Sequence, residues 1–194
     1  DDSWLEEIRR NLPELPADRK RRFIRDYALR ESDAEILINT VELADFFEEG
    51  VSEHPDSRAV SAWITGDFLH LLKEEKISIS ESKLKPENLG RMLKLMDEGI
   101  INGKIAKEVF REMFLTGEMP EQVIEKKDLR QITDRTFLEA VILRKIKDNQ
   151  ELVEEIRSGK EKALAFLVGQ VMKETRGRAN PELVNSILEE KINE

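Results

Sequence analysis

The segment from Gly159 to Pro181 constrains the fold of this chain more than any other. On a helical wheel at about 100° per residue, apolar side chains cover most of the circumference of a helix at about 160–175. They are Ala163, Leu164, Phe166, Leu167, Val168, Val171 and Met172. A helix that is apolar over so wide an arc needs other helices to cover it. We therefore expect it to be largely buried in a compact set of helices.

A narrow basic stripe takes up the rest of this helix. We define it by five residues: Lys162, Ala165, Gly169, Lys173 and Arg176. Glycine within a helix costs roughly 1 kcal/mol relative to alanine, so Gly169 indicates tight helix packing or the close approach of another backbone. Arg157 to Arg178 holds six basic and two acidic residues, a net +4 in a chain whose net charge is −9. On pattern alone, a solvated face with a packing glycine is the simpler interpretation.

The rest of the chain also favours helices. Of its 194 residues, 38% are charged and 6% are aromatic, which is typical of helical proteins with wide solvated faces. Helix start signals recur along the chain, at Pro16, Ser32, Thr40, Ser57, Pro86, Asn102 and Asn180. The brief alternation at 77–80 is predicted to be a loop. We predict an all-α fold, with a helical bundle over 1–127 followed by a small compact helical tail subdomain over 128–194.

Composition excludes several kinds of site. The chain has no cysteine, which rules out disulfides and thiolate metal ligands. Its two histidines are predicted in a loop, His54, and on a helix surface, His70. No hydrolase, zinc or phosphate-loop motif occurs, so we expect no catalytic residue and no metal site. No apolar run approaches the roughly 20 residues of a membrane span, and no signal peptide is visible in the sequence that opens at Asp1. We expect a piece of a longer, soluble cytoplasmic protein.

A family resemblance adds to this interpretation. The tail motifs are Gly159-Lys160, Ala163, Leu167 to Lys173, Thr175, Gly177 and Ala179-Asn180-Pro181. Three further segments follow the same order upstream: Asn11 to Pro16, Ala59 to Ile64 and Gly103 to Lys107. Together they resemble the C-terminal helical and tail region of the B subunit of the bacterial aspartyl/glutamyl-tRNA(Asn/Gln) amidotransferase, over nearly the whole chain.

That resemblance implies a function. The family is a glutamine-hydrolysing, ATP-dependent ligase of protein biosynthesis, a heterotrimer that converts Glu-tRNA(Gln) and/or Asp-tRNA(Asn) to the amide forms. ATP and Mg²⁺ belong to an N-terminal domain absent here, so no cofactor is expected in this fragment. The implied partners are tRNA(Gln) and/or tRNA(Asn), the amidase A subunit and the small C subunit, with the cognate aminoacyl-tRNA synthetase as a further candidate. The tail would hold the outer corner, or elbow, of the tRNA, far from the reaction.

The stripe supplies the predicted contacts. Lys162, Lys173 and Arg176 would meet phosphates, while the small residues Gly169 and Ala165 would let the ribose-phosphate chain approach. Further predicted RNA contacts lie beside the stripe and in the turn after it: Gln170, Gly177, Arg178 and Asn180. A second candidate contact, on an N-terminal helix, is Arg19, Arg21, Arg22 and Arg25, with a solvated face as its alternative.

Two other classes of function stay open. A protein–protein docking module with no RNA contact would leave activity intact after charge reversal on the stripe. An enzyme with an unrecognised site would bind nucleotide in isolation.

Overall fold

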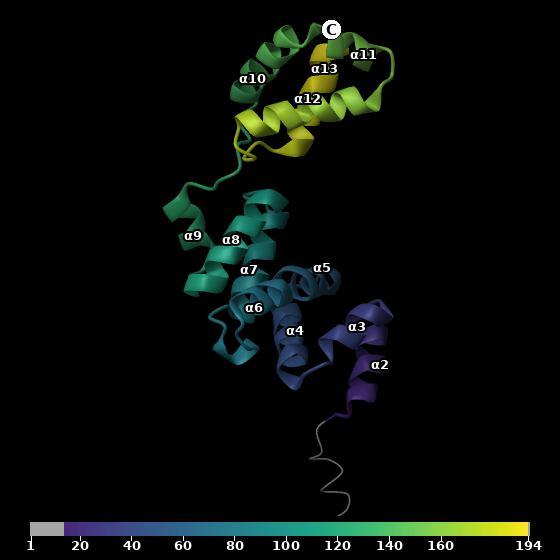
Figure 1. The fold of residues 1–194 in the computed structure, drawn as a ribbon, viewed down its shortest axis with the longest axis vertical. Coiled ribbons are helices and arrows are strands. Elements are labelled where there is room, and N and C mark those ends of the chain that lie inside the picture. The colour runs from purple at the N-terminus through teal and green to yellow at the C-terminus, as the bar shows by residue number, and fades with distance from the viewer. Residues whose placement is uncertain (1–13, 194) are drawn as a thin grey trace, which may run out of the picture. The chain divides into compact units, whose positions relative to one another are not determined.

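The computed structural model describes residues 14–193 (Figure 1). The described chain is helical, and its only β-type pairing is an isolated bridge between Ile132 and Ala179. The predicted all-α class is confirmed. Residues 1–13, with Asn11 to Pro13 of the resemblance, and Glu194 lie outside the described residues.

The chain forms two compact units. The first reaches Leu93 and takes in Phe114–Gly117, and the second contains Lys94–Met113 and the chain from Glu118 onward. Helices α7 (Pro86–Asp97) and α8 (Gly103–Thr116) contribute to both. These units divide the chain at other residues than 1–127 and 128–194, and that domain division stays a prediction.

The first unit is a run of short helices around an aromatic core. Its elements before α7 are α2 (Pro16–Asp26), α3 (Glu31–Leu37), α4 (Val41–Glu53), α5 (Ser57–Trp63), the π-helical turn η1 (Ile64–Phe68), α6 (Leu69–Glu75) and the 3₁₀ turn η2 (Ile79–Glu81). Ring centroids lie 4.9 Å apart for Phe23 and Phe47, and 4.6 Å apart for Phe46 and Phe68. Ring–ring interactions of this kind stabilise the fold beyond the contribution of the apolar area that each ring buries.

One prediction about this unit needs correction. Ser32 does not cap a helix, because α3 already begins at Glu31 after an extended Arg30. The helical residues that begin at Ser57 continue without a break to Glu75, and their middle turn, η1, is π-helical and contains Gly66, a weak helix former. The predicted cap at Thr40 is confirmed, since its hydroxyl accepts a hydrogen bond from the Leu43 amide at 3.1 Å.

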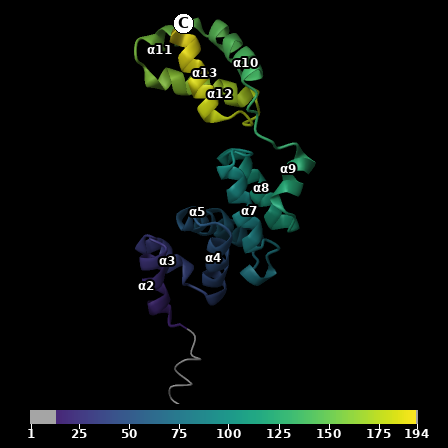
Figure 2. The same cartoon turned by 180° about the vertical axis from the view of Figure 1, so that it is seen from behind.

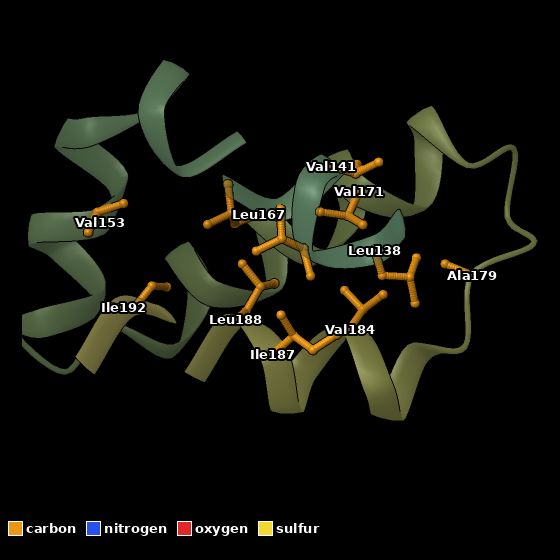
Figure 3. Close-up of a cluster of buried hydrophobic side chains, with 11 residues drawn as sticks. Leu138, Val141, Val153, Leu167, Val171, Ala179, Val184, Ile187, Leu188 and Ile192 are labelled. Atoms are coloured by element: carbon orange, nitrogen blue, oxygen red, sulfur yellow. The ribbon is translucent and has the colours of Figure 1, made fainter. Parts of the chain in front are cut away.

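The last four helices of the second unit enclose its main core. After α9 (Pro120–Lys127) come α10 (Arg135–Asp148), α11 (Gln150–Arg157), α12 (Glu161–Glu174) and α13 (Pro181–Asn193), which pack on one another in both views (Figures 1 and 2). The bounds of α12 lie close to the predicted 160–175. The core gathers Leu138, Val141, Ile142, Val153, Leu167, Val171, Ala179, Val184, Ile187, Leu188 and Ile192 (Figure 3).

Candidate nucleic-acid interface on helix α12 and the following turn

Helix α12 buries one face and exposes the basic stripe. Leu167 and Val171 are fully buried among side chains of α10 and α13 (Figure 3). On the solvent side, all five residues of the stripe are exposed. The helix is therefore anchored by a narrower apolar face than the sequence predicts, and the stripe is free to meet a partner.

Phe166 is the apolar residue that departs from the prediction. The sequence pattern predicts it inside, but 56% of it is exposed. Four residues after Lys162, it sits only about 40° further round the helix, so it borders the stripe rather than the core. The hydrophobicity of the Phe166 side chain suggests burial, whereas its angular position on α12 places the ring in solvent.

Gly169 has no packing reason within the described chain. A Cβ atom built at this position would meet no atom within 4 Å. Of the two explanations for this glycine, tight packing against another helix of this unit therefore fails. Gly169 lines an open hollow of about 430 Å³ together with Ala165, Phe166, Gln170 and Lys173.

The cations of the stripe are the unpaired ones in this region. Arg157, Lys160 and Arg178 form ion pairs with Glu154, Glu155 and Asp128, at 3.3, 2.9 and 2.9 Å. Lys162, Lys173 and Arg176 have no ion-pair partner among the described side chains, which are those of residues 14–160 and 162–193. Glu174, the acid next to Lys173, is taken up by Lys145 at 2.7 Å and Arg144 at 3.1 Å. The stripe thus keeps its positive charge.

A fourth cation, Lys104 of α8, lies against the turn that follows α12. Arg176 and Gly177 both have a positive φ, of 56° and 78°, and reverse the chain at the end of the helix. A Cβ at Gly177 would lie 2.4 Å from the Lys104 Cδ, so the α8 lysine runs across this glycine. Lys104 is exposed and has no ion-pair partner in the described chain. The sequence pattern does not reveal this approach, because only the fold brings the two segments together.

Asn102 ties this turn to α8. Its Oδ1 accepts hydrogen bonds from the amides of Lys104 and Ile105, both at 3.0 Å, and so caps the helix as predicted. Its Nδ2 donates to the carbonyls of Gly177 and Ala179, at 2.9 and 3.2 Å. One side chain therefore fixes both the start of α8 and the course of the turn.

Replacing Asn102 should cost more than the loss of a cap alone. Thr40→Ala removes only the cap of α4, for which about 1 kcal/mol is typical. Asn102→Ala also leaves two carbonyls of the turn without their donor, and we expect a total loss of about 2–3 kcal/mol. Urea denaturation followed by circular dichroism compares the two variants. Equal losses of stability in the two variants would contradict the role of Asn102 in holding the turn to α8.

Comparison with known proteins identifies the family. Residues 45–192 match the family model described as the GatB domain. The chain belongs to the GatB domain family. Proteins named as the B subunit of aspartyl/glutamyl-tRNA(Asn/Gln) amidotransferase are similar to it over nearly its whole length. The one from Carboxydothermus hydrogenoformans is 51% identical over 192 residues, 99% of this chain and 40% of the relative. The one from Thermotoga maritima is 47% identical over 188 residues, 97% of this chain and 39% of the relative.

The predicted resemblance to these amidotransferase proteins is thereby confirmed. The chain spans about 40% of the length of the relatives it matches.

Two of the predicted RNA contacts have structural roles in this GatB domain. Arg178 donates from Nη1 to the Asp128 carbonyl at 2.8 Å in addition to its ion pair. Asn180 caps α13 as predicted, accepting from the Leu183 amide at 2.9 Å. Asp97 and Glu182 line the hollow beside Asn180, and their charges oppose a phosphate there. Gln170 is half-buried at the edge of the α12 hollow. RNA contact by these residues stays a prediction.

The N-terminal arginine cluster is ion-paired, unlike the stripe. It lies on α2, before the residues that match the GatB domain. Arg19 pairs with Asp45 and Glu48, Arg21 with Asp18, Arg22 with Glu14 and Glu48, and Arg25 with Asp26. An RNA phosphate would have to displace these carboxylates. The prediction of a second RNA contact stays untested, and its solvated-face alternative now includes this network.

These pairs make the first unit sensitive to acid. Burial favours a higher pKa for Glu48, but hydrogen bonds from Arg22 and Arg19 outweigh it and hold the pKa below its usual value. The hydrogen bond from Arg22 also lowers the pKa of Glu14. A lowered folded-state pKa contributes stability that is complete above the unfolded value of about 4.3 and is lost as pH falls through the folded value.

Glu48→Gln should therefore flatten the acid limb of the stability curve. We expect the variant to be less stable at pH 7 and to lose less further stability between about pH 4.5 and 3. Glu42→Gln is the control, because Glu42 lies on the same helix and has no ion-pair partner within residues 14–193. Denaturation measured across this pH range gives the stability of each variant. If Glu48→Gln loses stability towards acid as steeply as the parent, the ion-pair network does not explain the acid sensitivity.

A membrane-spanning helix and a cluster of metal-ligating side chains are both absent from the described residues. None of their helices has the length and apolar content that crossing a bilayer requires. No group of three or more histidine or carboxylate side chains in this part of the chain could hold a metal ion. The expected absence of cofactors, of a metal site and of catalytic residues stays a prediction.

Proposed function

We propose that this chain is the tRNA-positioning region of an amidotransferase B subunit. The whole enzyme would convert Glu-tRNA(Gln) or Asp-tRNA(Asn) to the amide form with ATP and glutamine, in complex with an A and a C subunit. Family membership supports this role, as do the names of the relatives. This region would hold the tRNA by its elbow and take no part in the chemistry.

The proposal rests on two features of the basic stripe, the pairing of its cations and the open space above its glycine. Its three cations have no ion-pair partner among the described side chains, while the other basic residues of Arg157–Arg178 are paired, and its glycine has open space above it. A phosphate backbone accounts for both features, because it neutralises the cations and needs close access to the helix. Lys162, Lys173 and Arg176 would contact phosphates, and Gly169 with Ala165 would admit the ribose.

Lys104 extends this surface beyond α12. Its ammonium group lies over Gly177, next to Arg176, and would contact a further phosphate. This role gives the resemblance at Gly103-Lys104 a physical meaning. Gly177 would then serve the site indirectly, because any side chain there would push Lys104 away.

The mechanism is positional. A reaction at the 3′ end of a tRNA gains specificity from contacts elsewhere, since folded RNA is recognised largely by shape and backbone. Holding the elbow fixes the acceptor end relative to the catalytic subunits and lowers the entropy cost of the reaction there. The residues of this chain would bind and orient, without moving a proton.

Amidation kinetics of the assembled complex test the proposal. With Lys173→Glu and Arg176→Glu, we expect the KM for tRNA to rise while glutaminase activity is unchanged. Unchanged KM in a folded variant would contradict the proposal and favour a docking module, in which the stripe meets a protein or only solvent.

A further inference from the structure

Phe166 is an exposed aromatic ring on the central part of a well-packed helix. It follows the buried Ala163 by three residues and directly precedes the buried Leu167, yet more than half of it faces solvent. Its neighbours leave the ring accessible, since it lines the open hollow beside Gly169.

The hollow combines three kinds of chemistry. Phe166 supplies a flat apolar face, Gln170 an amide that can donate and accept hydrogen bonds, and Lys173 a positive charge. Ala165 and Gly169 add almost no bulk and leave about 430 Å³ open. Small-molecule sites commonly measure about 300–1,000 Å³, so a single nucleotide is a suitable size.

We propose that Phe166 stacks on an unpaired nucleobase of the bound tRNA. The inference rests on the proposed function and names the part of the tRNA that this hollow receives. The base would lie on the ring, the Gln170 amide would meet its edge or the ribose, and Lys173 would meet the phosphate of the same nucleotide. Proteins recognise loop nucleotides in this way, by stacking splayed bases on aromatic rings.

Charge favours this occupant over a peptide. The ring shares its hollow with Lys173, which has no ion-pair partner among the described residues, in a segment of net charge +4. An apolar helix docked on Phe166 would leave that cation without counter-charge, whereas a nucleotide satisfies the ring and the charge together. An unpaired base is required because a base within a duplex already stacks on its neighbours.

Substitutions at Phe166 in the assembled complex test the proposal. We expect Phe166→Ala and Phe166→Leu to weaken tRNA binding about 5- to 100-fold, the range of base–aromatic stacking, and Phe166→Trp to keep it. The salt dependence of binding should not change, because every cation that meets a phosphate is still present. Phe137→Ala on α10 is the matched control, since Phe137 is 47% exposed in the same unit and does not line the hollow.

The outcomes separate this inference from the proposed function. If Phe166→Ala binds normally while Lys173→Glu binds weakly, stacking is wrong and the RNA-facing stripe stands. If Phe166→Leu binds as tightly as the parent, the interaction is apolar rather than stacking, and the inference fails. If neither Phe166→Ala nor Lys173→Glu weakens binding, the proposed function fails as well. Circular dichroism confirms folding of each variant.

Discussion

Charge reversal at Lys173 and Arg176 is expected to raise the KM for tRNA about 100-fold in the assembled amidotransferase. Each substitution replaces a charge-assisted hydrogen bond to a phosphate, typically worth about 1.5–3 kcal/mol, by repulsion. The two substitutions together should therefore cost about 3 kcal/mol or more of tRNA binding free energy. Neither side chain has an ion-pair partner among the described residues, so the folded state should lose little stability.

Salt distinguishes direct RNA binding from an indirect effect. Each phosphate that is no longer neutralised should reduce the slope of log affinity against log salt by about one unit, so the double variant should reduce it by about two. Arg157→Glu is the control, because Arg157 lies in the same basic segment but is paired with Glu154. A smaller affinity with an unchanged slope would mean that the fold, rather than the RNA-binding surface, was disturbed.

Filling Gly169 is expected to move stability and binding in opposite directions. Gly169→Leu should stabilise the helix by about 1 kcal/mol, because leucine is the better helix former and the space above is open. The same side chain would fill the hollow and hold the RNA backbone away from α12. We expect tRNA affinity to fall at least about tenfold, the effect of removing a well-placed hydrogen bond to a charged group.

A matched substitution controls for surface bulk. Ser186→Leu adds a similar apolar side chain on α13 in the same unit, away from the core. It should leave tRNA affinity unchanged. Thermal unfolding and tRNA binding are measured on the same preparations. If Gly169→Leu is more stable and binds tRNA as tightly as the parent, close approach of RNA at Gly169 is wrong.

The helices and their caps could be predicted because their signals are local. Thr40, Asn102 and Asn180 each cap a helix whose apolar period begins within a few residues. The basic stripe is local for the same reason, since spacing along one helix defines it. The prediction for Phe166 is wrong because it follows the hydrophobicity of the side chain, whereas the position of the residue on the helix places the ring in solvent.

Contacts between distant segments could not be predicted from the sequence. Lys104 approaches Gly177 only because Asn102 binds the turn, and no local pattern connects the two segments. The two basic clusters also look alike as sequences. Only the fold shows that Arg19 and Arg22 face Glu48 whereas Lys173 faces solvent.

Photo-crosslinking from the basic stripe tests the central claim most directly. A benzoyl-phenylalanine replaces Ala165, an exposed stripe residue, in the assembled complex with bound tRNA. The same group at Leu143, which is 50% exposed on α10, is the control. We predict crosslinks from position 165 to loop nucleotides at the tRNA elbow and none from position 143. Crosslinks from position 165 to a protein subunit alone would contradict the account and establish the stripe as a docking surface.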